Sequence, residues 1–297
     1  MFEKLFAESG LSLDRLRALL EVNAAGSIVK AAIGDPVKQS QYSRQIKELE
    51  DFFRIKLVER HGKGIRLTSN GKELARISRF FLLGLSNFQR GCLAEEQTFR
   101  VGASRTFIDH FLLPVLSDNA RLKAGPRYAV EIASDDEIER RLHDLTLDFG
   151  IVTTATLSRP LQLKDLGGWK LNLWLPCEIC RNEPHVSRAL KERRLPMILP
   201  VRELPPLDLL DGYEPCLTCD SFVEALIALR SRNMATFLPD FLKPETGDAF
   251  RRVRVSGISN RTFHHRLAWN PRLLRLNPHM IRRRDFLLES LTMRLRS

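Results

Sequence analysis

Apolar and polar positions in the first part of the chain follow the pattern of short amphipathic helices. Leucine and valine recur at three- and four-residue spacing from Leu13 to Val22, directly after Ser12, a residue type that commonly caps helix starts. A glycine interrupts this pattern, and the following Ser27 caps a second short helix over residues 28–33. The spacing therefore predicts two short helices in succession.

A third helix is predicted from about Gln39 to Phe52, after the Gly-Asp-Pro sequence at residues 34–36 breaks the pattern. Its apolar stripe consists of Tyr42, Ile46, Leu49 and Phe53. Its other side carries Ser40, Ser43, Arg44 and Lys47. Three short helices, of which the third is polar and basic on its outer face, are typical of a helix-turn-helix.

The next segment alternates between apolar strands and a polar, glycine-containing tip. Residues 55–58 and 65–68 predict two strands, and residues 61–64 (His-Gly-Lys-Gly) predict a basic turn between them. Such a hairpin after a helix-turn-helix is a wing.

A long helix is predicted from Gly71 to about Cys92, capped by Thr68 or Ser69. Its apolar residues recur at three- and four-residue spacing, and the last four of them are phenylalanine or leucine. They are Leu74, Ile77, Phe80, Phe81, Leu85 and Phe88. A stripe so rich in phenylalanine requires a partner helix, so we expect this helix to mediate dimerisation.

From Thr98 onward the pattern alternates between strands and helices, which predicts one or two mostly parallel sheets. Strands are predicted at 99–102, 128–132, 149–152, 172–175, 197–199, 216–218 and 235–238. Helices are predicted at 107–119, 137–145, 187–193 and 222–230. A last apolar segment at helical spacing, residues 286–293, is expected to pack on the body of the protein.

Residues 12–76 resemble the DNA-binding domain of the LysR-type transcriptional regulators. The resemblance rests on Gly26-Ser27 with Ala31-Ala32, on the segment from Ser43 to Glu50, on Leu57 and Arg60, and on Leu67-Thr68 with Gly71. The chain departs from the family at Lys38-Gln39, expected just before the recognition helix, at Asp35 and at Val58. The remainder is similar to the effector domain through Gly102, Leu113-Pro114, residues 147–151 and Leu238-Pro239.

This resemblance implies an α/β protein with an N-terminal winged helix-turn-helix, a long linker helix and two Rossmann-like subdomains of the periplasmic-binding-protein type. The winged helix-turn-helix is expected over residues 11–69, the linker and dimerisation helix over 70–95, and the effector-binding domain over 96–297. Subdomain I is expected at about 98–174 and 262–297, and subdomain II at about 175–261.

Composition and charge agree with a DNA-binding protein. The 297 residues carry a net charge of +11, which favours an anionic partner, most commonly nucleic acid. Residues 250–297 alone carry 12 basic and 2 acidic side chains. No apolar run is long enough to span a membrane, and the N-terminus lacks the features of a secretory signal, so we expect a cytoplasmic protein.

The predicted recognition helix presents amide, hydroxyl and cationic groups at a spacing that suits the major groove. Glutamine can bind an adenine edge, arginine a guanine edge, and lysine or serine a phosphate oxygen. The candidates on this helix are Lys38, Gln39, Ser40, Ser43, Arg44 and Lys47. The candidates for phosphate contact outside it are Lys30, Arg60, His61, Lys63 and Arg66.

The cysteines and paired acidic or histidine residues could indicate metal or catalytic chemistry. The pairs Cys177/Cys180 and Cys216/Cys219 are 35 residues apart and lie in or beside predicted strands, so we favour unligated thiols over a zinc or redox site. His264-His265 and Asp135-Asp136 are better explained as a strand pair that faces opposite ways and as a helix start. No hydrolase, metalloprotease or dinucleotide motif is present, so we expect no enzyme, cofactor or metal.

An effector site is expected where strands end and helices begin, across the cleft between the two subdomains. Hydroxyl and backbone N–H groups there favour an anionic metabolite. The candidates are Ser104, Arg105, Thr106, Ser134, Asp135, Thr153, Thr154, Val201 and Arg202.

The sequence thus favours a dimeric or tetrameric, ligand-responsive transcription regulator. The alternative is an architectural or constitutive DNA-binding protein whose C-terminal half only oligomerises. A solute-binding protein is excluded by the winged helix and by the lack of an export signal.

Overall fold

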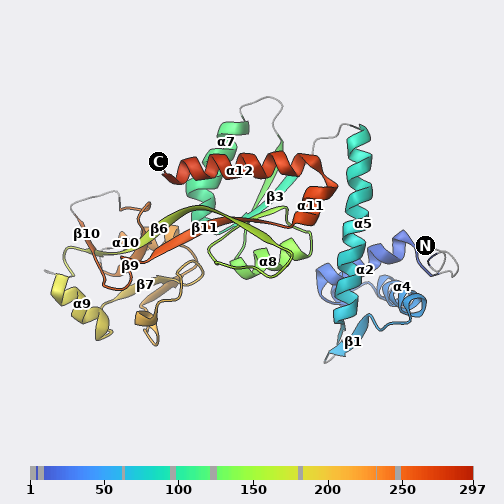
Figure 1. Ribbon diagram of the computed structural model, residues 1–297. Coiled ribbons are helices and arrows are strands. Elements are labelled where there is room, and N and C mark those ends of the chain that lie inside the picture. Colours follow the sequence, from blue (N-terminus) through green and yellow to red (C-terminus); the bar gives the residue numbers. More distant parts are fainter. Residues whose placement is uncertain are drawn as a thin grey trace. The chain divides into compact units, whose positions relative to one another are not determined.

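The computed structural model describes residues 5, 10–61, 64–93, 98–120, 126–179, 183–231, 233–244 and 249–296. Contacts divide the chain into two units, residues 1–95 and residues 96–297 (Figure 1). Among the described residues, no helix has the length and apolar character that crossing a membrane requires.

The first unit begins with helices whose starts are set by polar caps. Ser12 accepts a hydrogen bond from the backbone N–H of Arg15, and Ser27 accepts one from that of Lys30, as the sequence predicts. The helices are α2 (Leu13–Ala25), α3 (Ile28–Ala31), α4 (Pro36–Phe53) and α5 (Ser69–Leu93), and the strands are β1 (Val58–His61) and β2 (Gly64–Leu67).

Helix α4 starts three residues earlier than the sequence predicts. The Asp35 carboxylate accepts hydrogen bonds from the backbone N–H groups of Val37 and Lys38, and Pro36 occupies the first helical position, where no N–H is needed. The Gly-Asp-Pro break is therefore the start of α4, and Lys38-Gln39 lies inside the helix rather than before it.

The core of the first unit joins the helices to the wing. The fully buried side chains include Leu19 of α2 and Ile46 and Leu49 of α4, which confirms the central part of the predicted stripe. The predicted strand at 55–58 was wrong in its bounds, because β1 begins only at Val58. Instead, the buried Glu50 carboxylate accepts hydrogen bonds from Leu57 N (2.8 Å) and Val58 N (3.2 Å). This side chain ties the recognition helix to the base of the wing.

The second unit is built around a mixed sheet. Its described strands are β3 (Thr98–Ala103), β4 (Arg127–Ile132), β5 (Phe149–Val152), β6 (Gln162–Pro176), β7 (Met197–Pro200), β8 (Leu217–Cys219), β9 (Ala235–Pro239), β10 (Phe250–Val253) and β11 (Thr262–Trp269). Its described helices are α6 (Arg105–Phe107), the π-helical η1 (Ile108–Leu112), α7 (Leu113–Ala120), α8 (Asp135–His143), α9 (Glu183–Lys191), the 3-10 helix η2 (Asp208–Leu210), α10 (Phe222–Leu229), α11 (Pro271–Leu276) and α12 (Pro278–Arg296).

The strands follow the order β4-β3-β5-β11-β6-β9-β7-β8, with β10 paired to β6. Strand β3 is parallel to β4 and β5, and β7 is parallel to β8 and β9, as the strand–helix alternation predicts. The long strands β6 and β11 pair antiparallel with each other and with their neighbours. The sequence analysis did not predict β10 or residues 162–171 of β6, and it placed only His264-His265 of β11 in a strand.

Two lobes share β6 and β11. The first lobe is the part around β3, β4 and β5, and the second lobe is the part around β7, β8, β9 and β10. Leu163 of β6 packs with the apolar core of the first lobe, whereas Leu171, Leu173 and Leu175 of the same strand lie in the core of the second. In Figure 1, α7 and α12 lie above the strands of the first lobe and α8 lies below them.

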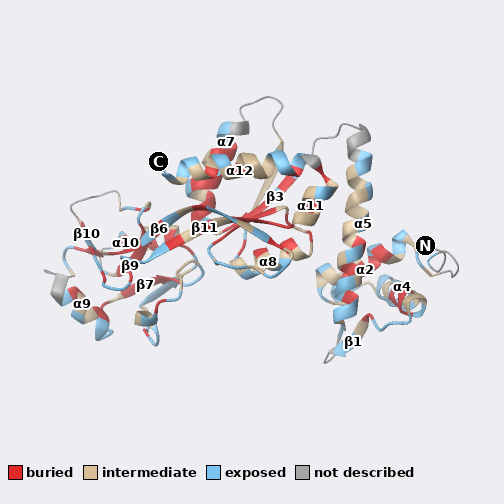
Figure 2. Ribbon diagram, viewed as in Figure 1, coloured by how far each residue is buried: buried red, intermediate tan, exposed pale blue. Residues whose placement is uncertain are grey.

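Close packing between α8 and the sheet of the first lobe depends on glycine. A Cβ atom at Gly150 of β5 would lie 2.2 Å from Cγ2 of Ile138 in α8, so no larger residue fits without displacing that side chain. Leu147, Phe149 and Ile151 are buried as well. Figure 2 shows buried positions of the central strands in red.

The C-terminal helix packs as predicted, but it is longer and its arginines have a different role. Leu287 and Leu291 are fully buried, while Met293 is 67% exposed. The guanidinium of Arg283 lies 5.9 Å from the ring centre of Phe99, and that of Arg284 lies 5.4 Å from Trp269. These two arginines cover aromatic rings of the core.

Candidate functional sites

A polar and cationic surface covers the exposed side of α4 and continues onto the wing. Ile46 and Leu49 face the core, so the opposite side of α4 faces solvent. Every predicted DNA-binding residue whose side chain is described is exposed, namely Lys30, Lys38, Gln39, Ser40, Ser43, Arg44, Lys47, Arg60 and Arg66. The side chain of His61 and all of Lys63 lie outside the described residues.

Two acidic side chains of α4 are engaged within the first unit. Glu48 forms an ion pair with Arg15 of α2 and lies 3.8 Å from Arg44 on its own helix. Glu50 is buried and bonded to the base of the wing. The exposed residues of α4 include the cations Lys38, Arg44 and Lys47 and one carboxylate, that of Asp51.

One exposed apolar residue on this surface was missed by the sequence analysis. Val37, in the first turn of α4, is 76% exposed. The segment before Gln39 was taken as a break, so Val37 was not placed on the helix. An apolar side chain at the start of a recognition helix can contact the methyl group of thymine.

A cavity of about 560 Å³ lies in the second unit, lined by residues of both lobes. Eight of the nine residues expected at an effector site line it, namely Ser104, Arg105, Thr106, Ser134, Asp135, Thr153, Thr154 and Arg202. Seven of them come together because β3, β4 and β5 all end at this side of the sheet, and Arg202 follows β7 of the second lobe.

Val201 does not line the cavity. Its backbone N–H donates to the carbonyl of Cys219 (2.9 Å), which continues the ladder between β7 and β8, and its side chain is 55% exposed. The neighbouring Arg202 lines the cavity and lies 3.2 Å from Asp220.

The cavity is lined by several aromatic rings that the sequence analysis did not single out. They are Phe107, Trp169, Phe222, Phe241, Phe263 and His265. The rings of Trp169 and His265 stack with centres 5.5 Å apart. These residues come from α6, β6, α10, β11 and the turn after β9, which are distant in sequence, so periodicity gives no signal that they share one wall.

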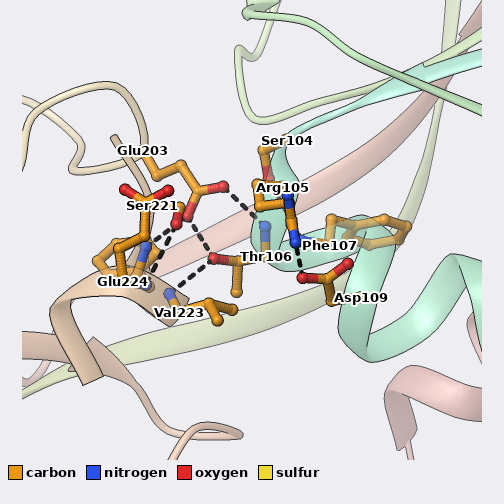
Figure 3. Close-up of polar contacts among 10 residues, drawn as sticks. Ser104, Arg105, Thr106, Phe107, Asp109, Glu203, Ser221, Val223 and Glu224 are labelled. Atoms are coloured by element: carbon orange, nitrogen blue, oxygen red, sulfur yellow. Dashed lines mark hydrogen bonds and ion pairs between the residues drawn. The ribbon is translucent and has the colours of Figure 1, made fainter. Parts of the chain in front are cut away.

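Glu203 is a further residue of the cavity that sequence reasoning missed. Its carboxylate accepts hydrogen bonds from the backbone N–H of Thr106 (2.8 Å) and of Phe222 (2.8 Å), and from the hydroxyl of Thr106 (Figure 3). Thr106 belongs to the first lobe, and Glu203 and Phe222 belong to the second. Glu203 therefore links the two lobes inside the cavity.

The histidine and aspartate pairs behave as predicted. His264 lies 3.0 Å from the carboxylate of Asp165, whereas the neighbouring His265 is buried and 5% exposed. Burial lowers the pKa of His265 to about 3, with the charge of Arg266 as a further cause, so His265 is neutral at physiological pH. Asp135 lies in the first turn of α8, which Ser134 caps.

The described cysteines have the environment of unligated thiols. Cys177 and Cys216 are exposed, and burial raises the pKa of Cys219 to about 11. Within the described residues, no group of three or more His, Cys, Asp or Glu side chains could hold a metal ion. Cys180, the fourth member of the two pairs, and the side chain of Cys92 lie outside that part of the chain.

Comparison with known proteins identifies the first unit. Residues 13–72 match the family model described as "Bacterial regulatory helix-turn-helix protein, lysR family". The HTH-type transcriptional regulator HdfR of Shigella boydii is 25% identical over 169 residues, which is 55% of this chain and 61% of that protein. The match thus spans about three fifths of the length of this curated relative.

Solved structures resemble the chain over almost its whole length. ArgP of Mycobacterium tuberculosis has a TM-score of 0.67 at 18% identity, covering 93% of this chain and 96% of that one. Full-length LysG of Corynebacterium glutamicum with bound effector Arg has a TM-score of 0.62 at 16% identity, with coverages of 95% and 98%. Full-length CbnR in complex with its target DNA has a TM-score of 0.52 at 18% identity, with coverages of 92% and 99%.

These similarities agree with the caps, the wing and the two-lobed sheet described above. Residues 13–72 are thus similar to the lysR family of bacterial regulatory helix-turn-helix proteins, and over almost its whole length the chain has the fold of ArgP and LysG.

Proposed function

We propose that the chain is a sequence-specific, DNA-binding transcription regulator of the LysR type. The observation that carries this proposal is the exposed polar and cationic face of α4 beside the basic wing, within a family of regulatory helix-turn-helix proteins. Its partner is double-stranded DNA, so its place is the cytoplasm, and its role is regulatory rather than enzymatic. The DNA complex of CbnR supports this partner.

A small-molecule effector bound in the cavity between the two lobes controls this activity. The cavity volume of about 560 Å³ suits a small metabolite, and it favours a ligand-responsive regulator over an architectural protein. The effector contacts residues that line this cavity, which include the eight expected ones, and LysG with its bound effector Arg supports this role.

The chain acts as a homo-oligomer, a dimer or tetramer, through α5. Ile77, Phe81, Leu85 and Phe88 are 53%, 50%, 46% and 74% exposed, so the apolar stripe has no cover within its own unit. A second copy of α5 would bury this stripe and place two recognition helices on neighbouring half-sites.

The DNA-binding proposal is tested on an operator selected from random duplexes with the full chain. Arg44→Ala should weaken operator binding by about 1–3 kcal/mol and relax the preference at one base position, because a bidentate arginine contact to guanine is lost. Arg66→Ala on the wing should weaken binding to all DNA sequences similarly. It should also reduce the slope of log affinity against log salt concentration by about one, because one phosphate contact is lost.

The matched control is Lys191→Ala, which removes an exposed cation of the second unit. It should leave both the affinity and the base preference unchanged in the same gel-shift titration. If the full chain selects no sequence, or if Arg44→Ala behaves like the control, α4 is not the recognition helix.

A further inference from the structure

The backbone N–H groups best suited to an anionic ligand lie at two helix starts that face each other across the cavity. Thr106 lies at the start of the continuous helical segment 105–120, and Phe222 lies at the start of α10. N–H groups at helix starts have no partner within the helix and carry partial positive charge, so they favour a carboxylate.

In this chain, the carboxylate at that position belongs to Glu203. It accepts hydrogen bonds from both N–H groups at 2.8 Å and from the hydroxyl of Thr106, and that hydroxyl also accepts one from Val223 N at 3.3 Å (Figure 3). An anionic ligand at this position would have to displace a side chain that already holds three hydrogen bonds.

A second carboxylate of the chain, that of Asp135 in α8, binds the loop after β5. Asp135 accepts hydrogen bonds from Thr153 N, from the Thr153 hydroxyl and from Thr154 N, each at 2.9 Å. Two cationic residues of the cavity also have acidic partners, because Arg105 lies 2.7 Å from Asp109 and Arg202 lies near Asp220. The groups that the sequence analysis assigned to an anionic effector thus form hydrogen bonds or ion pairs within the chain.

The overall charge of the residues that line the cavity also disfavours an anionic ligand. Five carboxylates line the cavity, namely Asp135, Asp136, Glu137, Glu203 and Asp220. Three arginines line it, namely Arg105, Arg202 and Arg261, and Arg261 lies over the ring of Phe263 at 5.0 Å. An excess of negative charge raises the free energy of a bound anion.

Two buried polar atoms of the cavity-lining residues have no hydrogen-bond partner among the described residues. They are Nε1 of Trp169, a side chain 3% exposed, and Nδ1 of His265, 5% exposed. Buried polar groups are rarely left without a partner, so such atoms beside a cavity indicate a ligand that supplies one. The surrounding rings of Phe107, Phe222 and Phe241 favour a flat apolar body.

We propose that Glu203 occupies the carboxylate position of this cavity from within the chain, so that the cavity takes an aromatic ligand without a carboxylate. A hydrogen-bond acceptor on the ligand binds the N–H of Trp169, and its ring packs among the phenylalanines. This inference rests on the proposed function, in which the same cavity is the effector site, and it names the chemical class of the effector.

The test uses two probes of equal shape, benzamide and benzoate, with the full-length chain. Calorimetry and saturation-transfer NMR should show saturable binding of benzamide to the wild type, with benzoate at least about tenfold weaker because Glu203 holds the carboxylate position. In Glu203→Ala, the affinity for benzoate should rise at least about tenfold, because the N–H groups of Thr106 and Phe222 become available. The affinity for benzamide should stay within about threefold of the wild type.

Two further variants test the two parts of the site. Trp169→Phe should weaken benzamide by about fivefold or more, since the ring remains but the N–H donor is lost. Glu214→Ala, which removes an exposed carboxylate of the same lobe, should change neither affinity. If Glu203→Ala does not fold, Glu203→Gln keeps the shape of the side chain without the charge, and benzoate should gain at least about threefold.

The inference is overturned if the wild type binds benzoate as tightly as benzamide, if it binds neither probe, or if no Glu203 variant gains affinity for benzoate. Operator binding, measured separately, distinguishes this failure from failure of the proposed function. A chain that binds its operator but shows the wrong probe preference refutes only the ligand class. A chain with the expected probe preference but no operator refutes only the regulator proposal.

Discussion

Glu50 shows how one buried carboxylate joins two elements of the first unit. Its carboxylate accepts the backbone N–H groups of Leu57 and Val58, and it is only 7% exposed. We expect Glu50→Ala to destabilise the base of the wing by about 1–3 kcal/mol, because two backbone donors lose their acceptor. Hydrogen exchange measured by mass spectrometry should show faster exchange in peptides that cover Leu57 and Val58. Glu59→Ala, an exposed carboxylate on β1, serves as the control and should leave that exchange unchanged.

His265 makes the stability of the second unit depend on pH. Burial holds the pKa of His265 at about 3 in the folded chain, below its ordinary value of 6.5. The unfolded chain therefore binds a proton between pH 6.5 and pH 3 that the folded chain does not bind. The stability that neutral His265 allows is full above pH 6.5 and falls by up to about 1.4 kcal/mol per pH unit below it.

We expect His265→Phe to reduce the loss of melting temperature between pH 7 and pH 5, since phenylalanine carries no proton and fits an aromatic wall. His264→Phe is the matched control, because His264 is partly exposed and lies beside Asp165. An unchanged pH dependence in His265→Phe would show that other groups cause the loss.

Residue-scale predictions from sequence succeeded where the rule was local. The alternation of a strand places His264 and His265 on opposite faces, and the serines at positions 12 and 27 cap helices. The hydrogen bonds of Glu203 join residues 97 positions apart in the chain. No local pattern contains that pairing, so the residue was absent from the predicted site.

At the scale of elements, α5 is the clearest case of a helix with an uncovered apolar stripe. We expect Ile77→Asp combined with Phe81→Asp to convert the oligomer to a monomer, because the carboxylates would lie in the seam between two copies of α5. Analytical ultracentrifugation measures this change. Lys72 lies on the opposite side of the helix from Phe81, about two and a half turns away. The control variant Lys72→Asp should therefore leave the sedimentation unchanged. A double mutant that sediments like the wild type would contradict the role of α5.

The start of α4 shows why element boundaries were less well predicted than the elements themselves. A Gly-Asp-Pro sequence is compatible both with a break and with a capped helix start. The hydrogen bonds from Val37 N and Lys38 N to Asp35 decide for the helix. As a result, Val37 and Lys38 belong to the recognition helix, and its exposed face begins earlier than predicted.

At the scale of the whole molecule, the strongly basic C-terminal segment is partly a packing feature. Arg283 is half-buried over the ring of Phe99, whereas the neighbouring Arg282 is exposed. We expect Arg283→Ser to lower the stability of the second unit by about 0.5–2 kcal/mol, as measured by thermal unfolding, because a partly desolvated cation–π contact is lost. Arg282→Ser should leave the melting temperature unchanged. Equal melting temperatures for the two variants would show that the contact to Phe99 contributes nothing.

The sequence by itself determined the winged helix-turn-helix, the long helix α5 and the polar face of α4. Each depends on contacts between residues three or four positions apart, or on caps beside the helix, and such patterns are visible in one dimension. It also located eight residues of the cavity, because parallel strands bring their ends to one side of a sheet.

Only the tertiary structure decided what that cavity can bind. Strands β6 and β11 cross between the lobes and bring Trp169 and His265 together, although 96 residues separate them in the chain. Likewise, Glu203 meets Thr106 only because the two lobes face each other. These pairings depend on the packing of distant elements against one another, and sequence periodicity reports only which face of an element is buried, not which residue it meets.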